Sequence, residues 1–163
     1  MKRTLDILFE RLAIFVSAST LLVALFSMAI QVIYRYVFND SLVWSEEVAR
    51  YALIWSAMIG AAVAYRRGDH AAVVSLVARL PAALQVITAR AVHLTIFGFS
   101  AALTWYGWQL TMRNFERNQL SSALEIDIAW VNLAIPVGGL LIMIAAIEGM
   151  FAATKAHEGI TAI

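Results

Sequence analysis

"LAIFVSASTLLVALFSMAIQVIY", residues 12–34, decides the fold, because it runs for 23 residues without one Asp, Glu, Lys or Arg. A helix rises about 1.5 Å per residue, so this stretch is long enough to cross a hydrocarbon core of about 30 Å. Arg11 and Arg35 bound it on the two sides. The stretch therefore predicts a membrane-spanning helix, and it is too long for the apolar region of a cleaved signal peptide.

The whole chain has the composition of a membrane protein. Of its 163 residues, 62% are hydrophobic and 14% are charged, whereas soluble domains have about 45–50% apolar and roughly 25% charged residues. Apolar residues come in blocks and do not alternate, which argues against a membrane β-barrel. We predict an all-α integral membrane protein, with one domain over residues 1–163. Its four predicted transmembrane helices cover about residues 12–34, 44–66, 87–112 and 128–152.

The loop between the second and third predicted spans contains "HAAVVSLVARLP", residues 70–81. Val73, Val74, Val77 and Leu80 fall on one side of a helix, and Pro81 ends the segment. This segment is too short to cross the bilayer, so we predict a short amphipathic helix on the membrane surface.

The positions of the basic residues predict the orientation. Eight lie on the side of the two termini and four on the other side. Because loops rich in Lys and Arg stay in the cytoplasm, both termini are predicted to be cytoplasmic.

The second span begins with a cluster of charges. Its uncharged part, residues 51–65, is about 22 Å long as a helix, so the helix must begin earlier, near Ser41 or Trp44. Glu46 and Arg50 are then spaced i,i+4 with the acid first, which is the favourable order.

These charges share a helix face with small residues, which mark places where membrane helices approach closely. We therefore predict a surface for another subunit, and the alternative interpretation is an interfacial anchor with snorkelling charges. The candidate subunit-interface residues are Trp44, Glu46, Glu47, Arg50, Ala57, Gly60, Ala61, Ala64, Pro136 and Gly138.

The third and fourth spans carry packing features. His93, Ser100 and Thr104 fall on one face of the third span and predict a polar seam suited to hydrogen bonds between helices. In the fourth span, Pro136 is followed by Gly138 and Gly139, so a kink is expected there.

Features of a transport or catalytic site are missing from the sequence. No carboxylate lies at the centre of a predicted span, and one broken helix has no counterpart, whereas carriers place their sites at such features. No catalytic cluster, nucleotide-binding loop or metal-ligand spacing is present, so we predict no enzymatic activity, no cofactor and no metal. A net charge of +1 predicts no nucleic-acid partner. By elimination, the chain is predicted to be an accessory subunit in contact with lipids.

Several sequence blocks add a family resemblance. They are "QVIYRYVFNDSLVWSEEVARYALIW" (31–55), "RRGDH" (66–70), "RLP" (79–81), "WYGW" (105–108) and "SSALEIDIAWVNLAIPVG" (121–138). In this order they resemble the small, DctQ-like membrane subunit of tripartite ATP-independent periplasmic (TRAP) transporters. The first block is the most specific.

The resemblance implies a function and partners. Such a subunit pairs with a large membrane subunit of the bacterial inner membrane, which carries the sodium and substrate sites. A periplasmic substrate-binding protein delivers an organic acid, such as a dicarboxylate or sialic acid, and the sodium gradient drives uptake. The small subunit would brace the large one.

A second function class stays open at this point, namely the membrane anchor subunit of a redox enzyme complex. Such anchors often hold haem between two histidines. His93 is the only histidine within a predicted span, so a single chain lacks the second ligand.

Overall fold

The protein is built from long helices. A computed structural model describes residues 2–67 and 81–161, and within these ranges no β-strand is present. The helices are α1 (Lys2–Val37), α2 (Val43–Arg67), α4 (Ala82–Arg117), the single-turn α5 (Ala129–Asn132) and α6 (Ala134–Thr161). The prediction of an all-helical protein is therefore confirmed.

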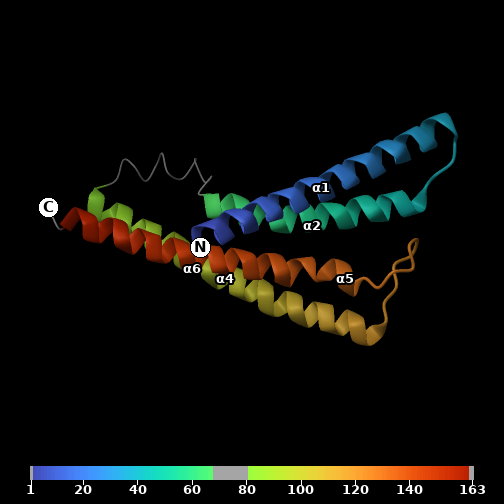
Figure 1. Ribbon diagram of the computed structural model, residues 1–163. Helices are drawn as coiled ribbons and strands as arrows, with labels where there is room; N and C mark the ends of the chain where they lie inside the picture. Colours follow the sequence, from blue (N-terminus) through green and yellow to red (C-terminus); the bar gives the residue numbers. More distant parts are fainter. Residues whose placement is uncertain (1, 68–80, 162–163) are drawn as a thin grey trace.

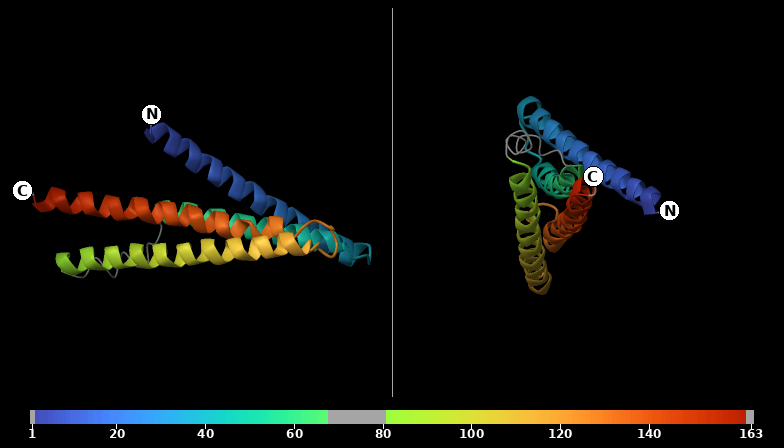
Figure 2. Two further views of the ribbon diagram at one scale, coloured as in Figure 1. Left: turned by 90° about the horizontal axis from the view of Figure 1, so that it is seen from below. Right: turned by 90° about the vertical axis from the view of Figure 1, so that its left-hand side faces the viewer.

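The helices form two hairpins that lie side by side (Figure 1). The first consists of α1 and α2, and the second of α4 and α6. The hairpins meet through α2 and α6, so the main packing order is α1, α2, α6, α4. Helix α1 leans away from the others toward its N-terminal end (Figure 2). The structure is thus closer to an open row of helices than to a closed four-helix bundle.

Small side chains make up the core of this row. The buried apolar residues include Ala49, Ala62, Ala134 and Ala146, and the largest fully buried side chain in the described ranges is Thr111. Bulky apolar side chains instead point outward, as Phe15 does with 72% of its surface exposed. Close approach through small residues, with large residues outside, is typical of helices that pack within a membrane.

Three segments within the described ranges are long and apolar enough to cross a membrane, namely Glu10–Val37, Val43–Arg67 and Ala129–Met150. They correspond to the first, second and fourth predicted spans. Helix α4, the third predicted span, is 36 residues long but is not among these segments. The polar and interfacial side chains of α4, such as His93 and Trp105, lower its hydropathy. The predicted amphipathic helix lies mostly in residues 68–80, outside the described residues, apart from Pro81, which caps α4.

At one end of the row, asparagine residues mark where two helices terminate. Asn39 and Asn118 have positive φ angles of 51° and 46°, and they follow the C-terminal ends of α1 and α4. Asparagine adopts this left-handed conformation more readily than most residues, so it ends helices. These turns bring the start of α2 and the 118–128 loop to the same end of the row.

The expected irregularity near Pro136 lies slightly earlier in the chain. Leu133 separates α5 from α6, and regular helix resumes at Ala134. Pro136 has no N–H, so it cannot donate to the carbonyl of Asn132 four residues before it. The missing bond accounts for the interruption next to Asn132.

Candidate functional site

The contact between the two hairpins is anchored at the 118–128 loop by a buried carboxylate. Glu47 lies one turn into α2 and is 6% exposed. Its Oε1 accepts hydrogen bonds from the Ser122 N–H at 3.1 Å and the Ser122 hydroxyl at 2.9 Å, and its Oε2 accepts one from the Leu124 N–H at 3.1 Å. One side chain of the first hairpin therefore holds the loop of the second.

The 118–128 loop is itself ordered by short-range bonds. The Ser121 N–H donates to the Ile126 carbonyl at 2.8 Å, and the Ile128 N–H donates to Gln119 at 3.0 Å. Asp127 accepts the N–H of Ala129 at 2.8 Å, which satisfies a free donor at the start of α5. The loop thus presents the N–H groups of Ser122 and Leu124 in a fixed arrangement that matches a carboxylate.

Two glycines allow close packing halfway along the helices. A Cβ atom at Gly138 of α6 would lie 2.7 Å from the Cβ of Met58 in α2. A Cβ atom at Gly139 would lie 2.7 Å from the Thr104 hydroxyl and 3.1 Å from the Ser100 carbonyl oxygen of α4. Helix α6 therefore touches both neighbours through adjacent glycines.

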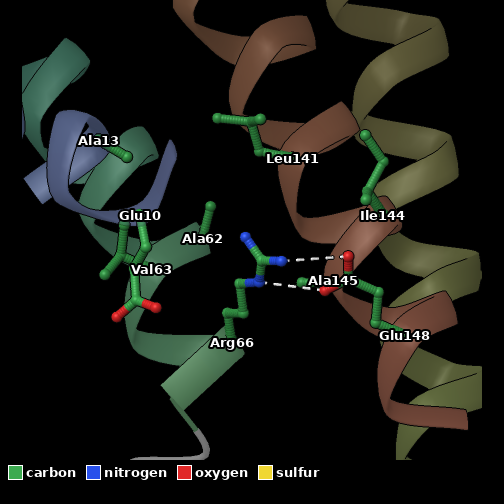
Figure 3. Close-up of a pocket in the computed structure, with 9 residues that line it drawn as sticks. All are labelled: Glu10, Ala13, Ala62, Val63, Arg66, Leu141, Ile144, Ala145 and Glu148. Atoms are coloured by element: carbon green, nitrogen blue, oxygen red, sulfur yellow. Dashed lines mark hydrogen bonds and ion pairs between the residues drawn. The ribbon is translucent and has the colours of Figure 1, made fainter. Parts of the chain in front are cut away.

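Ion pairs connect the helices at the opposite end of the row. Arg66 of α2 reaches Glu148 of α6 through two contacts, at 3.0 Å and 3.2 Å, and Arg67 reaches Glu10 of α1 at 2.7 Å. Figure 3 shows Arg66 pointing across a small cleft toward Glu148, with Glu10 on the α1 side. Charges at this end tie α2 to both of its neighbours.

A further polar contact joins α2 to α4 at this end. The Tyr65 hydroxyl and Nδ1 of His93 lie 2.6 Å apart in a hydrogen bond. A Cβ atom at Gly149 would lie 2.6 Å from the His93 ring, so a glycine of α6 leaves room for the imidazole. His93 is thus a packing residue with a polar partner.

Within residues 2–67 and 81–161, no group of three or more His, Cys, Asp or Glu side chains is placed to hold a metal ion. The described cleft at Arg66 is small, about 50 Å³, and its walls are mainly apolar. What the geometry does provide is a set of contacts that join the two hairpins near both ends and in the middle.

Comparison with known protein families decides the classification. The family model described as "Tripartite ATP-independent periplasmic transporters, DctQ component" matches residues 23–156. The chain belongs to the DctQ family. It is therefore a small permease subunit of a TRAP transporter, as the sequence blocks predicted, and a multi-pass membrane protein. The redox-anchor alternative gains no support.

Curated relatives of this DctQ-family chain include two sialic acid proteins. The "Sialic acid TRAP transporter small permease protein SiaQ" of Vibrio cholerae is 26% identical over 127 residues, which are 78% of this chain and 72% of that protein. The "Sialic acid TRAP transporter permease protein SiaT" of Haemophilus influenzae is 30% identical over 134 residues, which are 79% of this chain but 21% of that protein.

A third relative is also longer than this chain. The "Isethionate TRAP transporter permease protein DctMQ" of Oleidesulfovibrio alaskensis is 27% identical over 123 residues, which are 72% of this chain and 19% of that protein. Two of the three relatives thus contain the DctQ-like region as about a fifth of a longer permease.

The predicted interface residues of this DctQ-family chain separate into two groups. Exposed members lie on α2, and Glu46 and Arg50 among them form an ion pair at 3.6 Å with both side chains 59% exposed. The other exposed members are Trp44, Ala57, Ala61 and Ala64.

The remaining members lie against other parts of the same chain. Glu47 holds the 118–128 loop, and a Cβ atom at Gly60 would lie 3.1 Å from the Ser17 hydroxyl of α1. Pro136 and Gly138 are buried, against Gly107 of α4 and Met58 of α2 respectively. These four residues therefore pack within the chain, because the hairpins use them to approach each other.

Two of the three residues of the predicted polar seam on α4 form hydrogen bonds within their own helix and not to another helix. The hydroxyls of Ser100 and Thr104 donate to Phe97 and Ser100 of their own helix, at 3.0 Å and 2.8 Å. Both are small residues that pack next to Gly139 of α6, and their hydroxyls do not donate hydrogen bonds to α6. Backbone carbonyls one turn earlier are always within reach of such hydroxyls, which is why they bond locally. Only His93 forms an interhelical hydrogen bond among these three residues.

A serine pair that sequence reasoning missed joins α1 to α2. The Ser17 hydroxyl donates to the Ser56 carbonyl at 3.0 Å, and the Ser56 hydroxyl donates to the Ser17 carbonyl at 2.9 Å. The sequence shows that both serines lie within predicted spans. It does not show that the two residues, which are 39 positions apart, contact each other.

We expect Ser17→Ala and Ser56→Ala to be coupled. The two hydroxyl oxygens also lie 3.4 Å apart, within hydrogen-bond reach of each other. Each single change removes one hydroxyl-to-carbonyl bond and also this shared contact, so the double variant should lose less than the sum of the single losses. Interhelical hydrogen bonds in membrane proteins are worth on average about 0.6 kcal/mol and at most about 1.7 kcal/mol. Free energies of unfolding from detergent titration of all four proteins measure the coupling, and strict additivity would refute the contact between the two hydroxyls.

Proposed function

We propose that this TRAP small permease subunit is a non-catalytic brace for the large membrane subunit of a sodium-coupled importer of organic acids. The proposal rests on one observation: the two hairpins contact each other near both ends and in the middle, through Glu47, Gly138 and Arg66. Such a fixed frame suits a support for a moving transport domain. Its long uncharged stretches also lack the midplane carboxylate that a carrier would use.

The partner is a larger permease subunit of the same membrane. The proposal is supported by the two longer TRAP permease relatives, in which the matched region is about a fifth of the length. In those proteins the remaining length accompanies a DctQ-like region in one polypeptide. We infer that this chain meets an equivalent partner as a separate subunit.

Four membrane crossings fit the helix arrangement. Helix α4 packs along α6, which contains most of the apolar segment Ala129–Met150. A 36-residue helix is about 54 Å long, so α4 has the length to cross beside it. The outward rings of Trp105, Tyr106 and Trp108 suit a membrane–water interface. With four crossings in the bacterial inner membrane, the basic residues favour cytoplasmic termini.

The exposed strip of α2 is the proposed contact surface for the large subunit. It carries the Glu46–Arg50 ion pair at its outer end and the exposed side chains of Ala57, Ala61 and Ala64 along its length. Alanines leave room for a neighbouring helix to approach closely. An exposed acid and base at the membrane boundary can exchange partners with complementary charges on that helix.

The names of the relatives support a proposal for the substrate class. Two of them are named for sialic acid and one for isethionate, and both compounds are organic acids. We propose an organic acid of the sialic acid or dicarboxylate class, delivered by a periplasmic substrate-binding protein. Substrate recognition would reside in that protein and in the large subunit.

Arg50→Ala tests the contact surface. The exposed ion pair is worth about 1 kcal/mol or less to the chain itself, so the variant should insert and fold normally. Co-purification with the large subunit should fall, because the Glu46 carboxylate, once covered by the partner, would no longer have Arg50 to pair with. Arg113→Ala is the matched control, because Arg113 is also an exposed arginine but lies on α4. If Arg50→Ala co-purifies as well as the unchanged chain, the pair is an interfacial anchor only.

A further inference from the structure

An apolar groove runs between α4 and α6 on the surface of the second hairpin. Its volume is about 460 Å³. The α4 wall includes Ala101, Trp105 and Trp108, and the α6 wall includes Val137 and Leu140. The Thr104 hydroxyl also lines the groove, but it donates to the Ser100 carbonyl at 2.8 Å. The groove therefore favours an apolar occupant.

The length of the groove matches one leaflet of a bilayer. Its lining on the α6 side extends from Leu133 to Met143. Ten helical steps correspond to about 15 Å, which is half of a hydrocarbon core of about 30 Å. The apolar membrane segment begins at Ala129, four residues before the groove. The groove thus extends from the boundary near the 118–128 loop to about the middle of the membrane.

Aromatic rings lie along the α4 wall of this groove and at its loop end. Trp105 and Trp108 are 64% and 51% exposed, and Trp130 packs edge-on against Phe115 at a centroid distance of 5.8 Å. Tryptophan is favoured where hydrocarbon meets the headgroups, because its ring is apolar and its N–H is polar. The rings of Trp108 and Trp130 therefore lie near the glycerol region of a lipid whose chain fills the groove, and Trp105 lies one helical turn deeper along that chain.

We propose that the groove binds one acyl chain of a phospholipid from the leaflet on the side of the 118–128 loop. A partner helix is the less suitable occupant, because it would cross both leaflets and would favour small residues along its contact. The walls here are bulky, and the groove ends near the membrane centre. The proposal requires α6 to cross the bilayer and does not depend on the partnership with a large subunit.

Tryptophan quenching by a brominated lipid tests the proposal on the full-length chain. Trp44, Trp55 and Trp130 are replaced by Phe, so that emission comes from Trp105 and Trp108 in the groove. The delipidated protein in plain detergent is titrated with phosphatidylcholine that carries bromine atoms at mid-chain. Ala101→Phe fills the groove from α4, and Val137→Phe fills it from α6. Ala102→Phe is the matched control, because Ala102 lines a different hollow beside Tyr106.

We expect quenching to saturate at a single lipid per chain in the parent and in Ala102→Phe. The saturable component should be lost in Ala101→Phe and Val137→Phe. Circular dichroism checks that each variant is folded. If only one of the two variants folds, that variant alone is enough for the test. Quenching that rises in proportion to the lipid fraction without saturation would overturn the proposal. So would equal saturation in the filled variants.

Discussion

Glu47→Ala should release the 118–128 loop from α2 and lower the thermal unfolding midpoint of the purified chain by several degrees. The carboxylate accepts three hydrogen bonds, two of them from backbone N–H groups of Ser122 and Leu124. Alanine leaves these donors without their acceptor, and hydrogen bonds to a charged group are stronger than those between neutral groups. Cleavage by trypsin after Arg117, beside the loop, should become faster.

Glu46→Ala is the matched control for this prediction. Glu46 precedes Glu47 in the chain, but its side chain is 59% exposed and forms an ion pair with Arg50 of the same helix. Its loss should change the midpoint and the cleavage rate little. Equal effects of Glu46→Ala and Glu47→Ala would mean that the loop is held by its own short-range bonds, and the anchoring role of Glu47 would be refuted.

Gly139→Ala should destabilise the packing of α6 on α4 by about 1–3 kcal/mol, the usual cost of overfilling a packed core. The new methyl group would meet the Thr104 hydroxyl at 2.7 Å, and also the backbone of α4 at 3.1 Å. A hydroxyl can rotate away, but the helix backbone can only shift as a unit. The free energy of unfolding in a detergent titration measures the loss.

Gly98→Ala is the control for the same substitution in the same hairpin. Apart from its chain neighbours and the adjacent backbone of its own helix, no described atom would lie within 4 Å of a Cβ atom at Gly98. Alanine is the better helix former by about 0.5–1 kcal/mol, so this variant should be as stable as the parent or more stable. The two changes should therefore have opposite signs. Destabilisation of similar size at both positions would contradict the close contact at Gly139.

The helix boundaries were largely predictable because charge marks where a helix leaves the membrane. The second span was predicted at residues 44–66, and α2 runs from Val43 to Arg67. The start had to precede Tyr51, near Ser41 or Trp44, since the uncharged part alone is too short to cross. The first and last helices extend beyond their predicted spans, because a helix can continue into water where hydropathy no longer marks it.

Helix faces were predicted less well than helix boundaries. Angular position groups Glu46, Arg50 and Ala57 on one face, and these three residues are exposed. It did not predict that Glu47 turns toward the second hairpin, because its partners lie 75 and 77 positions away and include backbone groups. Gly138 and Pro136 illustrate a second limit, since a small residue signals close approach but does not identify the neighbour.

Interhelical polar contacts were the hardest feature to predict. Ser100 and Thr104 looked suited to bonds between helices, yet their hydroxyls donate within α4. Ser17 and Ser56 look no different in sequence and bond to each other. The difference lies in which helices are adjacent and how close they come, and a single sequence does not contain that information.

Reconstitution into proteoliposomes tests the central claim that this subunit braces a transporter and carries no substrate itself. The purified chain is compared with the chain plus its large permease subunit, with the binding protein, an organic acid substrate and an inward sodium gradient supplied to both. The account predicts no uptake above empty vesicles for the chain alone and sodium-dependent uptake for the assembled pair. Sodium-dependent uptake by the chain alone would contradict it.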